Sequence, residues 1–242
     1  MGRASPLGSC LSICLVTGCA ASGAGRYYGV PTTGRGIVFV LDVSSSMQGR
    51  SERRVEDAAA ARTIDAGKRA ADTAVRNSLP SKVGGLGDAV TSWMADRAHD
   101  ETYKLGRAKR ELAAAIETLP DSATFMVITF CDRVTRLNRD LIPATRSARQ
   151  DVARQVRALD TCGETRALAA LIEATAVPGA SVAFFVSDGV PSDAPPARIP
   201  SEVRDVARRR GIVIHTVGLG DDQDRPFLQS LAEQNGGRYV PR

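Results

Sequence analysis

Four runs of apolar residues constrain what this chain can fold into more than any other feature of its sequence. They lie at residues 36–41, 125–130, 182–186 and 212–217. Each has the length of a strand and lacks the alternation of apolar and polar residues that marks a strand with one wet face. Such runs are typical of parallel strands buried on both faces of a sheet. We therefore expect a parallel sheet at the centre of the protein.

Helix-like segments separate these runs. Apolar residues recur at spacings of three and four along one predicted helix, at Leu105, Ala108, Leu112, Ile116 and Leu119. Further helices are expected around residues 152–159, 167–174, 203–207 and 227–231. Short edge strands are expected at 133–137, as an antiparallel return, and at 238–240. Strands that alternate with helices predict a doubly wound, mostly parallel α/β fold over residues 36–242.

Residues from about 48 to 101 interrupt this alternation. The stretch 52–77 is rich in Ala and charged residues and is helix-prone, and a break follows at Pro80 and the glycines of 84–87. Two interpretations stay open: a surface helical insertion packed on the domain edge, or a lid or partner-binding element. Trp93, in the second part of the insertion, is expected to anchor it to the domain.

The first residues have the character of a secretion signal rather than of a folded domain. Arg3 precedes a short apolar segment at 11–16, which is too short to cross a bilayer as a helix. The sequence Val16-Thr17-Gly18-Cys19 resembles a bacterial lipobox, in which the cysteine becomes the lipidated first residue of the mature protein. We expect a signal peptide over 1–18, a lipidated Cys19 with a flexible tether through residue 35, and an exported lipoprotein facing the periplasm or cell surface. The alternatives are an ordinary cleaved signal with an incidental cysteine, or a misplaced start codon.

Composition argues against two classes of partner. Lys and Arg number 32 against 27 Asp and Glu, but the basic residues are spread among acidic ones and form no stripe. Aromatic residues make up 5% of the chain, so stacking platforms for single-stranded nucleic acid are scarce. We expect no nucleic-acid partner. The chain has 2 histidines, far apart in sequence, which argues against a zinc site of the His/Cys type.

The segment Asp42-Val43-Ser44-Ser45-Ser46 follows the first apolar run directly. In doubly wound sheets, ligands bind beyond the carboxyl ends of the strands. A carboxylate and two hydroxyls therefore reach the edge where sites form, with Asp42 expected at a solvent-facing strand end. These are hard oxygen ligands, which suit Mg²⁺ or Mn²⁺ better than Zn²⁺. Taken alone, the segment could equally be a capped turn that starts a helix.

Two later segments extend the pattern, and together they resemble the von Willebrand factor A (VWA) family with its metal-ion-dependent adhesion site. Thr165 opens a predicted helix within Asp-Thr-Cys-Gly-Glu-Thr, and Asp188 follows the third apolar run within Phe-Val-Ser-Asp-Gly. The resemblance covers residues 34–242 apart from the insertion. It implies Ser44, Ser46 and Thr165 as near ligands of Mg²⁺ or Mn²⁺, and Asp42 and Asp188 as acids that orient them.

The resemblance also implies a function. A metal held mostly by neutral oxygens remains electrophilic, so its open position seeks a carboxylate from a protein partner. We expect a non-enzymatic binding or adhesion module on a protein anchored to a membrane by lipid. The alternatives are a structural envelope lipoprotein with a silent site and, with less support, a Mg²⁺-dependent hydrolase. The sequence contains neither a P-loop nor a Gly-x-Ser-x-Gly motif.

Two cysteines remain in the predicted domain, Cys131 and Cys162. In an exported protein they are candidates for a disulfide, which would hold the loop that carries Thr165. Two buried thiols are the alternative. His215 lies inside an apolar run and is expected to pack in the core.

Overall fold

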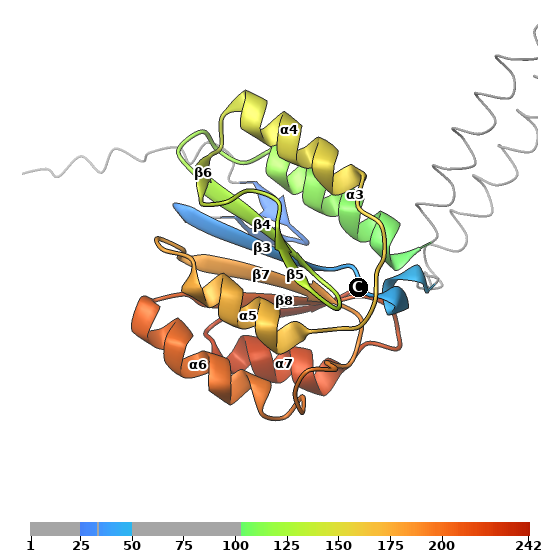
Figure 1. The fold of residues 1–242 in the computed structure, drawn as a ribbon. Helices are drawn as coiled ribbons and strands as arrows, with labels where there is room; N and C mark the ends of the chain where they lie inside the picture. The colour runs from blue at the N-terminus through green and yellow to red at the C-terminus, as the bar shows by residue number, and fades with distance from the viewer. Residues whose placement is uncertain (1–24, 33, 50–102) are drawn as a thin grey trace, which may run out of the picture.

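A seven-stranded sheet forms the centre of the protein in the computed structural model, which describes residues 25–32, 34–49 and 103–242 (Figure 1). The strand order is β5-β4-β3-β7-β8-β9, and β6 also pairs with β4. The bounds are β3 Gly36–Asp42, β4 Thr124–Phe130, β5 Val134–Arg136, β6 Ile142–Pro143, β7 Val182–Ser187, β8 Val213–Gly218 and β9 Tyr239–Pro241. The short β5 and β6 run antiparallel to β4, and all other pairs are parallel.

Helices cover both faces of this sheet (Figure 1). One layer consists of α3 Lys104–Glu117 and α4 Arg146–Arg157. The other consists of α5 Ala167–Ala176, α6 Ile199–Arg210 and α7 Arg225–Gln234. Because both faces are covered, β3 is buried along its whole length, with Phe39 in the core beneath α3 and Val40 in the core beneath α5. The structure confirms the predicted fold class, the central strands and the edge strands at 134–136 and 239–241.

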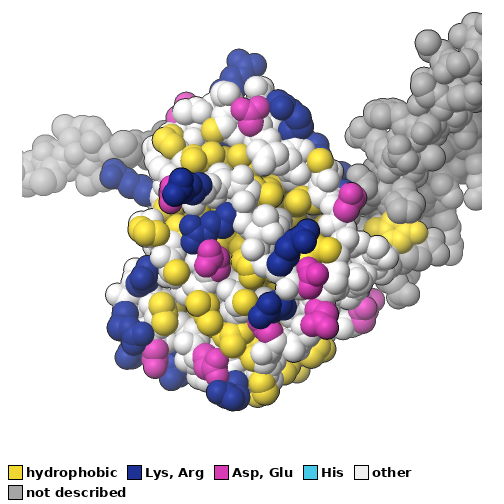
Figure 2. Space-filling view, in the orientation of Figure 1, with side chains coloured by type: hydrophobic (Ala, Val, Ile, Leu, Met, Phe, Trp, Pro, Cys, Tyr) yellow, Lys and Arg dark blue, Asp and Glu magenta, His cyan; other side chains and the backbone are white. Residues whose placement is uncertain are grey.

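Charged side chains of both signs lie on the outside of these layers. Figure 2 shows basic and acidic side chains interspersed over one face of the molecule. Among the helices in the described ranges, none is both long enough and apolar enough to span a membrane.

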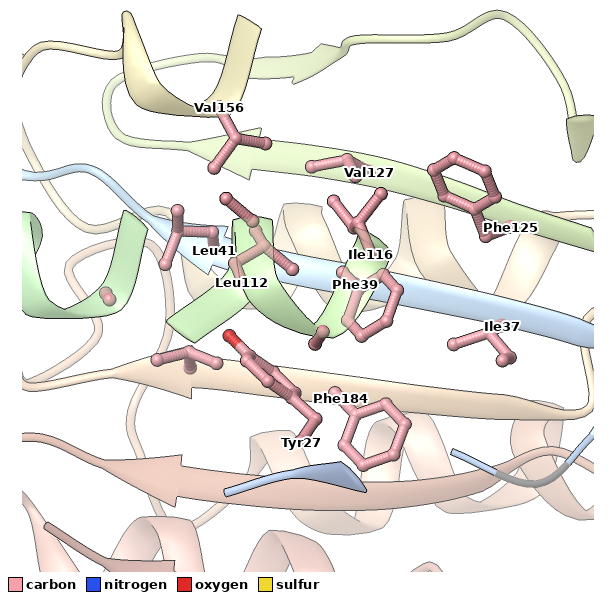
Figure 3. Packing of buried hydrophobic residues seen from close by; sticks show 14 of the residues in the cluster. Tyr27, Ile37, Phe39, Leu41, Leu112, Ile116, Phe125, Val127, Val156 and Phe184 are labelled. Carbon is pink, nitrogen blue, oxygen red and sulfur yellow. The ribbon is translucent and has the colours of Figure 1, made fainter. Parts of the chain in front are cut away.

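The prediction of a flexible tether through residue 35 was wrong for its second half. A two-stranded hairpin, β1 Arg26–Tyr27 and β2 Val30–Pro31, precedes the sheet. Its Tyr27 is 1% exposed and packs edge-on against Phe39 and Phe184, with ring centroids 5.2 and 5.5 Å apart (Figure 3). Burial of a whole aromatic ring outweighs the turn-forming composition of the segment, so the ordered domain includes this hairpin.

Several predictions fall outside the described residues. They concern the signal peptide over 1–18, the lipidation of Cys19, and Trp93 with all of the insertion beyond Gly49.

Candidate metal centre

Asp42 is the last residue of β3, and its carboxylate is completely buried. Its Oδ1 accepts a hydrogen bond from the backbone N–H of Ser44 at 2.8 Å, and its Oδ2 accepts one from Ser187 Oγ at 2.6 Å. Asp42 thus lies at a strand end as expected, but this end does not face solvent at Asp42, because its side chain turns under the loop that follows β3. Burial raises the pKa of Asp42 to about 6, although both serines stabilise its charged form.

Two hydroxyls connect this loop to the end of β7. Ser44 and Ser46 flank the start of a 3-10 turn, η1 Ser45–Gln48, and their Oγ atoms lie 3.0 Å apart. Ser46 Oγ donates to Asp188 Oδ1 at 2.8 Å. Because β3 and β7 are adjacent and parallel, with Leu41 level with Val186, Asp42 and Asp188 both lie at the carboxyl edge of the sheet. Four of the predicted residues thus form one hydrogen-bonded group.

The loop that carries Thr165 is tied to the same edge by its backbone. Cys162 N–H donates to Val43 carbonyl oxygen at 2.7 Å, and Ser45 N–H donates to Gly163 carbonyl oxygen at 3.2 Å. In the structure Cys162 is also joined to Cys131, which follows β4, by a disulfide. These links place Thr165, which is 8% exposed, beside the serines.

Gly189 lies against two of these hydroxyl groups. A Cβ atom placed on Gly189 would lie 3.2 Å from Ser46 Oγ and 3.5 Å from Thr165 Oγ1. A side chain here would crowd Ser46 Oγ and contact Thr165 Oγ1, and glycine avoids this. The structure therefore brings together all five residues that the sequence predicted, namely Asp42, Ser44, Ser46, Thr165 and Asp188.

Sequence reasoning missed a cation at this site. Lys104, the first residue of α3, extends its Nζ to 2.7 Å from Asp188 Oδ2 and to 2.6 Å from Asp222 Oδ1. The side chain of Lys104 is 2% exposed. Burial alone would lower its pKa, but the hydrogen bonds and charges of the two carboxylates together raise it. No motif marks Lys104, since in sequence it is one of several basic residues around the predicted helix.

The donor set fits a hard divalent cation. Hydroxyl and carboxylate oxygens are the ligands that Mg²⁺ and Mn²⁺ take in proteins. Asp42 and Asp188 are both buried. Among the residues that the structure describes, Lys104 forms an ion pair with Asp188, and no ion pair is seen for Asp42. A metal bound by Ser44, Ser46 and Thr165 would supply an electrophilic centre with a position open to an outside ligand.

A parallel α/β sheet with hydroxyls and acids gathered at its carboxyl edge belongs to the doubly wound folds, which bind ligands beyond the carboxyl ends of their strands. Comparison with known families makes the assignment specific. A family model described as "von Willebrand factor type A domain" matches residues 35–61 and 96–240, which is more than half of the chain. The chain belongs to the von Willebrand factor type A domain family.

The human von Willebrand factor A domain-containing protein 3A is 27% identical over 118 residues, which are 48% of this chain and 10% of that protein.

Solved structures show the same fold at low identity. The von Willebrand factor type A protein from Catenulispora acidiphila superimposes with a TM-score of 0.59 at 17% identity, over 88% of this chain and 39% of that chain. The manganese-loaded TRAP protein from Plasmodium vivax superimposes with a TM-score of 0.50 at 15% identity, over 86% of this chain and 68% of that chain. The present chain thus spans well under two thirds of the human relative and of the Catenulispora chain.

Proposed function

We propose that this domain binds one Mg²⁺ or Mn²⁺ ion through Ser44, Ser46 and Thr165, with Asp42 and Asp188 orienting the hydroxyls. The observation that carries the proposal is the hydrogen-bonded path from Ser44 through Ser46 to Asp188, beside Gly189, which has no side chain to crowd these hydroxyls. The manganese-loaded state of the similar Plasmodium vivax protein supports it. The bound ion would capture a carboxylate that a protein partner presents.

The proposed activity is binding rather than catalysis. VWA domains are in general interaction modules. Few charged groups of the protein would contact the metal directly, so we expect modest affinity and an electrophilic ion. Water can replace one lost hydroxyl, so single serine substitutions should weaken metal binding less than loss of an acid.

Calorimetric titration with Mg²⁺ and Mn²⁺ tests the site. We expect one ion per domain for the wild type and at least tenfold weaker binding for Asp42→Asn and Asp188→Asn. Asp121→Asn is the matched control, because this 85% exposed acid lies after α3, far from the site, and loses the same charge. Equal metal binding in all three variants would contradict the site. If a partner is still captured in the presence of chelator, the metal site stands, but the metal does not bridge the domain to its partner.

A second candidate function is a structural domain whose site takes no metal. The ion pair between Lys104 and Asp188 favours this candidate, because it already provides a cation for one acid. The same titration decides between the two, since a silent site predicts no heat of binding for either ion.

We further propose that the domain is exported and held on a membrane through lipid on Cys19. The apolar segment at 11–16 and the lipobox-like residues 16–19 support this. Intact-mass measurement of protein from a bacterial envelope fraction should show acyl chains on Cys19, and Cys19→Ser should abolish them. A wild-type mass without acyl chains would contradict the anchor.

A further inference from the structure

Lys104 is a buried cation that faces the proposed metal centre from within the protein. Its ammonium contacts Asp188 through Oδ2, whereas Ser46 contacts the same carboxylate through Oδ1. Lys104 and Ser46 therefore contact the same carboxylate, each through a different oxygen. The carboxylate is fully buried, so water screens this contact little.

The surroundings of Lys104 accommodate its side chain closely. A Cβ on Gly220 would lie 2.6 Å from Lys104 Cε, and Gly220 has a φ of +82°, which favours glycine. A Cβ on Gly49 would lie 3.4 Å from both Cε and Nζ. Gly220 thus leaves room for the lysine to reach Asp188, and Gly49 lies in contact with its far end.

We propose that Lys104 is the internal counter-cation of the centre: it holds Asp188 in place when no metal is bound, and it lowers the affinity for a divalent ion. This inference rests on the proposed metal site. A buried carboxylate without a partner is costly, and Lys104 removes that cost for Asp188 in the metal-free protein. When a metal binds to the hydroxyls, the ammonium and the ion repel each other across Asp188 and Ser46, which lie between them. Lys104 is thus a positioning residue, which acts on the metal through Asp188.

Lys104→Met tests the proposal, because Met keeps most of the side-chain volume and removes the charge. Arg157→Met is the matched control: it removes one positive charge and one ion pair, that with Glu117. Glu117 is the last residue of α3 and Lys104 the first. The 14 residues of α3 separate the two positions by about 20 Å.

We expect Lys104→Met to bind Mg²⁺ and Mn²⁺ at least tenfold more tightly than the wild type by calorimetry. It should melt at a lower temperature than the wild type in chelator, and added Mg²⁺ should raise its Tm by more than it raises that of the wild type. Arg157→Met should bind the ions like the wild type. Simple structural damage would instead weaken binding, so the direction of the change separates the two explanations.

A second pair of variants keeps the test decisive if Lys104→Met does not fold. Asp222 is 70% exposed and is the other carboxylate bound by Lys104. Asp222→Asn should weaken metal binding at least threefold, because the ammonium then acts on Asp188 alone. Asp221→Asn, a neighbouring exposed acid with the same charge change, is the control and should have a smaller effect.

Three results would overturn the inference. If the wild type binds metal and Lys104→Met binds it equally or less tightly, the inference fails and the proposed function stands. If Asp222→Asn and Asp221→Asn weaken binding equally, the specific role of the lysine fails as well. If no variant and no wild-type protein binds either ion, the proposed function and the inference both fail.

Discussion

The backbone N–H of Lys104 donates a hydrogen bond to the carbonyl oxygen of Gly49 at 3.1 Å, although residues 50–103 separate the two in the chain. Gly49 N–H in turn donates to the carbonyl oxygen of Ser46 at 2.9 Å. Gly49 and Tyr103, between which the structure describes no residue, therefore lie close together next to the proposed metal centre. A short connection would therefore be enough to join Gly49 to Tyr103.

We predict that residues 50–102 can be replaced by a flexible linker of about six Gly and Ser residues, which spans roughly 13 Å. The variant should fold, with a Tm within about 5 °C of the wild type by circular dichroism, because the contacts of Gly49 and Lys104 remain. It should also keep its affinity for Mg²⁺. A linker of twice that length is the control for strain. Loss of the fold with both linkers would show that the segment is needed for stability.

Tyr27 offers a matched pair of substitutions. Its ring is fully packed, but its hydroxyl has no hydrogen-bond partner among the described residues, and burial raises its pKa well above the ordinary value. Tyr27→Phe should therefore leave stability unchanged or raise it by about 1 kcal/mol. Tyr27→Ala should cost about 3–5 kcal/mol, because it leaves a cavity between Phe39 and Phe184. Denaturant unfolding measures both. Equal stability of the Ala and Phe variants would show that the hairpin does not pack on the core.

The Cys131–Cys162 disulfide closes a loop with a sequence separation of 31. Replacing it with Cys131→Ala and Cys162→Ser should cost about 3–4 kcal/mol of unfolding free energy. The affinity for Mg²⁺ should fall severalfold, because Cys162 holds the loop of Thr165. Treatment of the wild type with reductant should reproduce both effects. If reductant changes neither property, the pair does not constrain the loop.

A pH dependence follows from His215. Its Nδ1 accepts a hydrogen bond from the backbone N–H of Arg238 at 3.0 Å, and its ring stacks on Phe184. Burial, and next the charge of Arg238, lower the pKa of His215 below 6.5. The unfolded state therefore binds the proton more readily, so this group destabilises the fold as the pH drops below 6.5 and contributes nothing above it.

His215→Asn, which keeps an acceptor for Arg238, should reduce the loss of stability between pH 7.5 and pH 5. The comparison must be made against the wild type at each pH in chelator. Asp42, with a pKa raised to about 6, has the opposite sign in this window: its contribution declines as the pH rises from about 4 to 6. An unchanged pH dependence in His215→Asn would assign the acid sensitivity to other groups.

Most of the fold could be predicted from the sequence, because each central strand is continuously apolar and the helices have apolar faces. The grouping of the five oxygen-bearing residues could also be predicted, because adjacent parallel strands end at one edge of the sheet and bring Asp42 and Asp188 to it. The hairpin around Tyr27 was missed because two-residue strands produce no periodic pattern. Lys104 was missed because its role depends on Asp188 and Asp222, which are distant in sequence, and on the room that Gly220 leaves. The inward turn of Asp42 depends on Ser187, a contact between two strands that local sequence does not reveal.

If the proposed lipid anchor on Cys19 is present, the position of the hairpin affects how the domain would stand on a membrane. Gly25, just before β1, lies against Thr118: a Cβ on Gly25 would be 3.0 Å from the Thr118 carbonyl oxygen. Thr118 caps the end of α3 opposite to Lys104, so Gly25 is about 20 Å from the proposed metal centre. The stretch from Cys19 to Gly25 can reach at most about 20 Å. A domain tethered by lipid at Cys19 would stay close to the bilayer. The end that carries the proposed metal centre would point away from the membrane, so that a ligand on a neighbouring surface would meet the ion first.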